Sequence, residues 1–326
     1  MRHMITGKVQ RELPLRVGLS SCLLGEMVRF DGGHKKDRYL TDILGAYFEW
    51  IMVCPEIEVG MGVPRESVRL VGSPESPRMV GTKSQTDWTE EMIRFSEQRV
   101  RQLEELQLSG YILKSDSPTC GMERVRVYAT SGIPAKNGRG LFAAAFMQHF
   151  PLIPVEEEGR LNDAKLRDNF IVRVFAYHRL QQLTASGFRR GDLVFFHAAH
   201  KYLILAHSPM HYQLLGKLVG TASTHTPADL RRKYCSLFME ALAVKTTVKK
   251  NVNVLQHILG FLRDHLGTSE KENIREVIND YARELVPLIV PLTLVRHYVR
   301  IYNIPYIRDQ IYLNPHPKEL MLRNHV

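Results

Sequence analysis

The sequence predicts an α/β N-terminal domain with a parallel or mixed sheet, followed by an all-helical C-terminal domain. Between residues 15 and 185, short apolar runs typical of strands alternate with helical patterns. After Gly191 the strand signal ends and helical periodicity continues. We therefore expect an N-terminal tail over 1–14, an α/β domain with its connecting helix over 15–187, and a helical domain over 188–326.

The α/β region contains five predicted strands, at about 15–24, 50–54, 110–114, 125–128 and 152–155. Its predicted helices cover about 39–48, 86–108, 141–149 and 162–185. Residues 55–81 are rich in glycine and proline, which indicates a functional loop. Further helices are predicted at about 192–207, 209–219, 227–244, 247–265, 269–285 and 288–302.

Composition favours a globular protein of a reducing compartment. No apolar run approaches the roughly 20 residues of a membrane span, and the N-terminus lacks the apolar segment of a secretory signal. Four cysteines in 326 residues do not make a disulfide framework. We expect a cytoplasmic protein whose thiols are free to bind metal or react.

The net charge of +10 is unevenly distributed. Residues 188–326 contain 19 Lys and Arg against 11 Asp and Glu, a net charge of +8, which leaves +2 for the first 187 residues. A basic C-terminal half favours a polyanionic partner, with nucleic acid as the first candidate. The alternative is a solvated basic surface without a partner.

Three cysteines follow predicted strands. Cys22, Cys54 and Cys120 each stand at the end of an apolar run, beside small or turn-forming residues. The carboxyl ends of strands line the ligand crevice of an open α/β sheet, so the three thiols can converge there. They would then supply three ligands to zinc or to a [4Fe–4S] cluster and leave one position open. Three separate buried thiols are the alternative, and Cys235 is interpreted as a core residue.

These residues carry a family resemblance. Four motifs over roughly 15–165 resemble the thiouracil desulfidase family: Ser21-Cys22-Leu23-Leu24-Gly25, Val28-Arg29-Phe30-Asp31-Gly32, Cys54-Pro55-Glu56 with Gly62-x-Pro64-Arg65, and Leu113-Lys114-x-x-Ser117-Pro118-Thr119-Cys120-Gly121. Two further motifs resemble the helical domain that is fused to such enzymes in the tRNA 4-thiouridine desulfidases: Phe196-His197-x-x-His200-Lys201-Tyr202-x-x-x-Ala206-His207 and Tyr212-x-x-Leu215-Gly216.

The resemblance implies a [4Fe–4S] cluster held by Cys22, Cys54 and Cys120. The substrate's thiocarbonyl sulfur would bind the open iron while water attacks the carbon, so that thione becomes carbonyl without net redox change. This chemistry combines Lewis-acid polarisation with general-base activation of water. The implied partner is tRNA or a thiolated nucleobase or nucleoside, and no membrane is implied.

The general base should be a carboxylate near the cluster. Glu56 lies two residues after a predicted ligand, and Asp31 lies in the loop after the first one. The alternative for each is an ion pair with a nearby arginine, Arg29, Arg65 or Arg78. Ser117 is a third candidate for the catalytic machinery, through hydrogen bonds to cluster sulfur or to the edge of the nucleobase, although turn capping is the more common role of such a serine.

Several residues are predicted to bind substrate. Ser21, Arg65, Lys114 and Ser115 stand in the cysteine motifs, where Arg65 suits a uracil oxygen or a phosphate. In the helical domain, His197 and His200 share one helical face with His207, and Lys201 borders that face. This face is predicted to contact RNA. The alternative interpretation is that the histidines line a packing face between helices.

The leading interpretation is thus a desulfidase that acts on 4-thiouridine in tRNA. One rival is the same chemistry on free thiobases, with a structural helical domain. A second rival is a non-catalytic iron–sulfur protein that binds RNA. A third is a zinc hydrolase.

Overall fold

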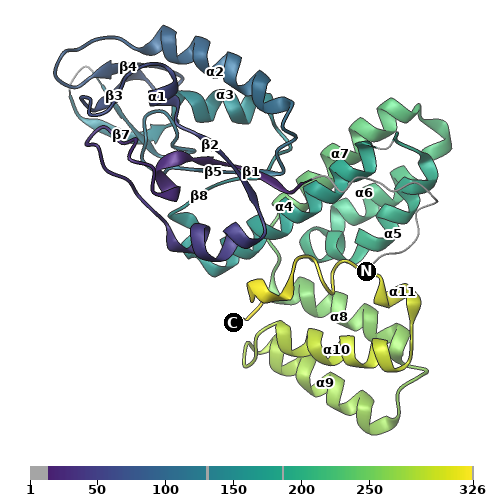
Figure 1. The fold of residues 1–326 in the computed structure, drawn as a ribbon. Coiled ribbons are helices and arrows are strands. Elements are labelled where there is room, and N and C mark those ends of the chain that lie inside the picture. The colour runs from purple at the N-terminus through teal and green to yellow at the C-terminus, as the bar shows by residue number, and fades with distance from the viewer. Residues whose placement is uncertain (1–13, 130–131, 186, 325–326) are drawn as a thin grey trace. The chain divides into compact units, whose positions relative to one another are not determined.

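The chain folds as two compact units, Leu15–Phe170 and Ile171–Val326. The computed structural model describes residues 14–129, 132–185 and 187–324 (Figure 1). The division between the units falls inside helix α4 (Ala164–Ala185), whereas the sequence predicts the domain boundary after that helix. The predicted order of an α/β region followed by helices is confirmed.

The first sheet of the N-terminal unit is fully parallel and has the strand order β2-β1-β5-β8. Its strands are β1 (Arg16–Ser20), β2 (Glu49–Val53), β5 (Gly110–Leu113) and β8 (Val155–Glu157). The continuous apolar runs of β1 and β5 are explained by burial on both faces, as expected for central strands of a parallel sheet. In this strand order, β1 lies between β2 and β5.

A second sheet is mixed and has the order β4-β3-β6-β7. β3 (Val68–Ser73) pairs in parallel with β6 (Val125–Tyr128), and β4 (Ser76–Gly81) and β7 (Pro134–Gly138) add antiparallel edges. The prediction of one long loop over 55–81 is wrong, because this segment contains helix α1 (Pro55–Glu58) and the β3–β4 hairpin. Gly72, Pro74 and Pro77 lie around the hairpin turn, and the other glycines and prolines lie in α1, in the segment before β3 and at the end of β4.

Two helices of the N-terminal unit pack side by side, α2 (Thr89–Glu104) and α3 (Leu141–His149), as Figure 1 shows. One core cluster joins the second sheet to α2 through Leu70, Met79, Met92, Val125 and Val127. The predicted helix at 39–48 is irregular. It consists of a π-type turn over Tyr39–Ile43 and a 3₁₀ turn over Leu44–Ala46.

Within its described residues the C-terminal unit consists of helices joined by loops and contains no strand, as predicted. Its helices are the second half of α4, then α5 (Arg190–His207), α6 (Pro209–Gly220), α7 (Pro227–Ala243), α8 (Val248–Leu262), α9 (Thr268–Ala282), α10 (Ile289–Ile301) and the short α11 (Pro305–Arg308). Ser208 and Thr226 cap α6 and α7 by accepting backbone N–H groups, and a proline follows each cap.

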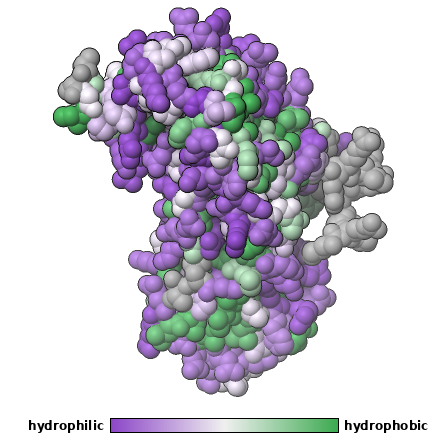
Figure 2. All heavy atoms as spheres, turned by 60° about the vertical axis from the view of Figure 1, so that its left-hand side comes forward, coloured by the Kyte–Doolittle hydropathy of each residue, from purple (hydrophilic) through white to green (hydrophobic). Residues whose placement is uncertain are grey.

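Hydrophilic residues cover most of the face shown in Figure 2, with smaller hydrophobic areas between them. Within the described part of the chain, no helix is both long enough and apolar enough to cross a membrane.

Gly18 is required where β1 lies against β5. In the sheet register it stands beside Tyr111, and a Cβ built on Gly18 would lie 2.2 Å from the tyrosine Cδ2. The buried Tyr111 ring packs on Phe146 of α3, with ring centroids 4.5 Å apart, so it has no free space into which to move.

Gly18→Ala is therefore expected to destabilise the N-terminal unit by about 1–3 kcal/mol through overpacking. Both tryptophans, Trp50 and Trp88, lie in this unit, so urea unfolding followed by tryptophan fluorescence reports on it selectively. Gly159→Ala is the matched control, because its nearest neighbour would be 3.9 Å away. Equal unfolding midpoints for the two variants would contradict the packing argument.

Candidate active site

The three cysteines predicted to converge lie at the ends of three neighbouring strands. Cys22 lies in the 3₁₀ turn that follows β1, Cys54 directly follows β2 and begins α1, and Cys120 lies in the turn after β5. The chain passes from β1 to β2 on one side and later to β5 on the other, so β1 marks a topological switch point. All three cysteines line one cavity of about 450 Å³.

Burial makes these thiols difficult to ionise. It raises the pKa of Cys22 to about 11 and that of Cys120 to about 12, and it also raises the pKa of Cys54. Negative charge on Cys54 raises the pKa of both other thiols further. Cys54 is therefore close enough to Cys22 and to Cys120 for the charged sulfurs to repel, and a bound cationic group would stabilise these thiols as thiolates.

Helix α3 fixes the turn that contains Cys120. The backbone N–H groups of Leu141 and Ala143 at its N-terminus donate to the carbonyls of Pro118 and Thr119, each at 3.1 Å. At Gly140 the helix comes so close to the turn that an added Cβ would lie 2.4 Å from the Thr119 carbonyl. The position of Cys120 thus depends on this helix terminus.

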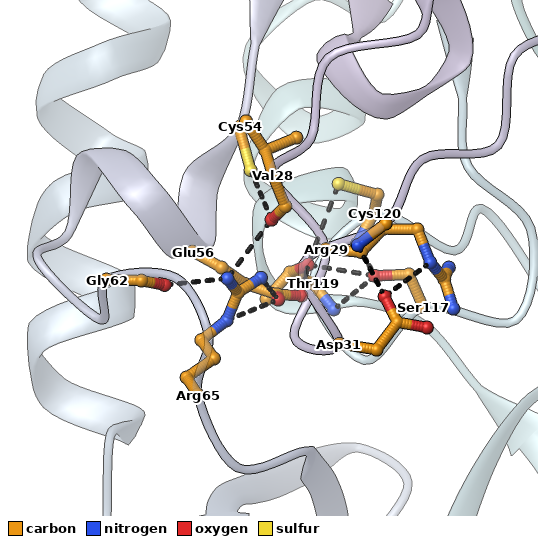
Figure 3. A network of polar contacts seen from close by, with 11 residues as sticks. Val28, Arg29, Asp31, Cys54, Glu56, Gly62, Arg65, Ser117, Thr119 and Cys120 are labelled. Atoms are coloured by element: carbon orange, nitrogen blue, oxygen red, sulfur yellow. Dashed lines mark hydrogen bonds and ion pairs between the residues drawn. The ribbon is translucent and has the colours of Figure 1, made fainter.

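A polar network surrounds Glu56 (Figure 3). One carboxylate oxygen accepts a hydrogen bond from Thr119 Oγ1 at 2.8 Å, and Thr119 Oγ1 lies 2.9 Å from Ser117 Oγ. The other oxygen accepts from Arg65 Nε at 3.1 Å and is also ion-paired with the Arg65 Nη2 group. Both Glu56 and Arg65 are largely buried and line the cavity.

Asp31, the other predicted base, is placed differently. Its side chain is half exposed and is absent from the cavity lining. It pairs with Arg29 at 3.4 Å and accepts the Gly33 N–H at 3.0 Å. The hydrogen bond from Gly33, followed by those from Arg29, lowers the pKa of Asp31. The ion pair that the sequence left open as the alternative is thus present for both carboxylates, Asp31 with Arg29 and Glu56 with Arg65.

The predicted binding residues of the cysteine motifs also line the cavity, namely Ser21, Arg65, Lys114 and Ser115. Lys114 and Ser115 are engaged by Glu158, which forms an ion pair with the lysine and accepts from Ser115 N at 2.8 Å and Ser115 Oγ at 2.7 Å. Sequence reasoning missed Glu158 and Thr119. The available signal for Glu158 was the acidic run 156–158, which follows the last predicted strand of the sheet.

The predicted histidine face of α5 is mostly a packing face. His200 is 3% exposed, stacks on Phe196 with ring centroids 3.9 Å apart, and places Nδ1 2.7 Å from the Phe196 carbonyl. His197 Nδ1 lies 3.2 Å from the Tyr234 hydroxyl. The prediction that His200 contacts RNA at the surface does not agree with this burial. Lys201, which borders the face, is half-buried, and its Nζ lies 4.5 Å from the ring centroid of Tyr306.

The buried histidines predict a pH dependence. Burial lowers the pKa of His197 to about 4 and that of His200 to about 3, from an ordinary value of 6.5. Between pH 6.5 and about 4 the unfolded chain therefore binds protons that the folded chain does not. The C-terminal unit should lose stability as the pH falls through this window, by at most about 1.4 kcal/mol per pH unit for each histidine.

Urea unfolding at pH 7 and pH 5, followed by far-UV circular dichroism, tests this dependence. The change between the two pH values should be smaller in the double variant His197→Gln, His200→Gln than in the unmodified chain. An identical change in both proteins would show that other groups control the acid sensitivity.

Each half of the chain matches a known family model. Residues 17–158 match the family model described as 2-thiouracil desulfurase, which confirms the resemblance seen in the cysteine motifs. Residues 201–317 match the model described as a protein of unknown function (DUF1722), which covers most of the helical unit.

Two relatives and one solved structure are similar to the chain. The uncharacterized protein YbgA of Escherichia coli (strain K12) is 30% identical over 165 residues, which are 50% of this chain and 98% of YbgA. The uncharacterized protein YbbK of Bacillus subtilis (strain 168) is 32% identical over 153 residues, 44% of this chain and 97% of YbbK. The structure titled [4Fe-4S]-dependent thiouracil desulfidase TudS is 30% identical, with 46% of this chain and 94% of that chain covered and a TM-score of 0.38.

The hypothesis of a non-catalytic iron–sulfur protein that binds RNA is rejected, because the matching family consists of enzymes. The chain belongs to the 2-thiouracil desulfurase family and is an enzyme, with its desulfurase region followed by a DUF1722 region.

Proposed function

We propose that the enzyme replaces the sulfur of a thiolated uracil by oxygen, and that its substrate is 4-thiouridine in tRNA. The observation that carries this proposal is the meeting of three thiols and a hydrogen-bonded carboxylate around one cavity. Water supplies the oxygen, and two protons leave with the sulfur as hydrogen sulfide. The reaction is a hydrolysis without net redox change.

The donor set fits a [4Fe–4S] cluster held by Cys22, Cys54 and Cys120. All three thiols line the same cavity, and cysteine thiolates are the ligands that iron–sulfur clusters take. When bound, the cluster would supply one iron without a protein ligand as a Lewis acid for the thiocarbonyl sulfur.

Glu56 is proposed as the general base that takes a proton from the attacking water. Its carboxylate lines the cavity, and hydrogen bonds from Arg65 and Thr119 fix its orientation. Ser117 acts as a positioning residue, because its hydroxyl contacts Thr119 and accepts the backbone N–H of Cys120 at 3.1 Å. A fixed base within reach of a bound water is the geometry that general-base catalysis requires.

The basic C-terminal half supports tRNA as the substrate, since its net charge of +8 would attract a polyanion. A free thiobase is the second candidate, because a cavity of about 450 Å³ is within the size range of small-molecule sites. All four cysteines are free thiols, which supports a reducing, cytoplasmic setting.

The test is anaerobic cluster reconstitution followed by iron analysis and turnover of 4-thiouridine in tRNA and of free 4-thiouracil. The unmodified protein should bind about four irons and release sulfide, whereas Cys120→Ala should lose both. Glu56→Gln should retain iron and lose about 10²-fold or more in kcat, while Asp31→Asn should retain most activity. Iron binding without sulfide release from either substrate would contradict the proposal, and a larger loss in Asp31→Asn would assign the base to Asp31.

The contact at Gly140 gives a second test. Gly140→Ala should move the turn that contains Cys120 and lower the iron content after reconstitution, because the new Cβ would collide with backbone rather than with a flexible side chain. Gly45→Ala is the control, since its nearest neighbours would be at an ordinary 3.5 Å. Full iron content in Gly140→Ala would show that the turn position is not critical for the cluster.

A further inference from the structure

We infer that the outer face of the second sheet binds the phosphate backbone of the RNA that presents the thiolated base. This inference rests on the proposed function and adds to it a location outside the basic helical unit. It concerns the face of β3, β6 and β7 that points away from the core cluster with α2, and it is carried by Arg69, Arg126, Tyr128 and Lys136.

Strand alternation places these side chains together. Leu70 and Val127 are partners in the β3–β6 register and belong to the core cluster, so their neighbours along each strand point to the opposite face. Arg69, Arg126 and Tyr128 therefore share that outer face. Lys136 of β7 pairs with Arg126 in the register and extends the face by one strand.

The charges of Arg69, Arg126 and Lys136 are not neutralised within the described parts of the chain, where no carboxylate forms an ion pair with any of them. Arg126 and Lys136 are also exposed. By contrast, the cavity cations Arg65 and Lys114 are paired with Glu56 and Glu158. Unpaired cations on one sheet face leave positive charge available for the phosphates of an external partner.

Arg69 and Tyr128 contact each other on this face. The Arg69 guanidinium carbon lies 5.2 Å from the centroid of the Tyr128 ring, whereas the buried Arg69 Nε has no hydrogen-bond partner among the described residues. Guanidinium planes and aromatic rings are the groups on which unpaired RNA bases stack. A surface of phosphate-binding cations beside a stacking platform fits a single-stranded RNA segment.

The face is continuous with the active-site cavity. Ser67, Val68 and Arg126 line the cavity, and β3 and β6 run parallel from these positions toward Arg69 and Tyr128. Residues two apart on a strand are about 7 Å apart, so the cations begin at the cavity rim and extend along the sheet. A nucleotide whose base enters the cavity would place the adjoining backbone over this face.

The test measures binding of a fluorescein-labelled 12-nucleotide uridine RNA to the full-length reconstituted protein by anisotropy, over a range of salt concentrations. The triple variant Arg69→Gln, Arg126→Gln, Lys136→Gln should lower the slope of log Kobs against log salt by about 2, since each phosphate contact on a single strand contributes about 0.7. The control Arg94→Gln, Arg101→Gln, Lys165→Gln removes the same charge from exposed helix positions of the same unit and should leave the slope unchanged.

Equal slopes for the two triple variants would overturn the inference, because the effect would then come from overall charge alone. If circular dichroism shows that the sheet variant is misfolded, the exposed single variant Lys136→Gln replaces it, with an expected slope decrease of about 0.7. A loss of binding to phosphatidylglycerol vesicles but not to RNA would also overturn the assignment to RNA. Sulfide release from free 4-thiouracil by the unmodified protein, measured in parallel, tests the proposed function independently of RNA binding.

Discussion

The position of β1 between two parallel neighbours is the constraint on which the whole candidate active site depends. Parallel strands end at the same edge of a sheet, and adjacent strands are about 5 Å apart. The turns that follow β1, β2 and β5 therefore place Cys22, Cys54 and Cys120 around one cavity. The close contact of Gly18 with Tyr111 keeps β1 against β5, and the N-terminus of α3 fixes the last of the three turns.

Arg65 connects the separate segments of the site. Its guanidinium orients Glu56, and Nη1 donates to the carbonyls of Val28 and Gly62 at 3.0 and 2.9 Å. One side chain thus joins the loop after Cys22, the helix after Cys54 and the loop before β3. Since an unpaired buried carboxylate is costly, this single cation both positions the carboxylate and supports the loops around it.

Local sequence signals predicted the order along the chain of the strands of the first sheet and most of the helices. Apolar runs followed by turn residues identified the three cysteines, and the predicted helix starts at about 209 and 227 agree with α6 and α7. The β3–β4 hairpin was missed because Gly72 and Pro74 suggested a loop, although its strands pair over six residues each. Burial that depends on residues distant in sequence could not be predicted from such local signals. Periodicity placed His200 on a helix face, but the burial of that face depends on α7, which is distant in sequence.

The cysteines are separated by 31 and 65 residues, which has a consequence for how the enzyme matures. No short segment of the nascent chain contains two of them, so the three thiols come together only after β1, β2 and β5 have paired. Contacts between such distant residues form late in folding, since closing long loops costs entropy. A cluster held by these thiols would therefore have to be delivered to a polypeptide that is already folded, through the mouth of the cavity that they line.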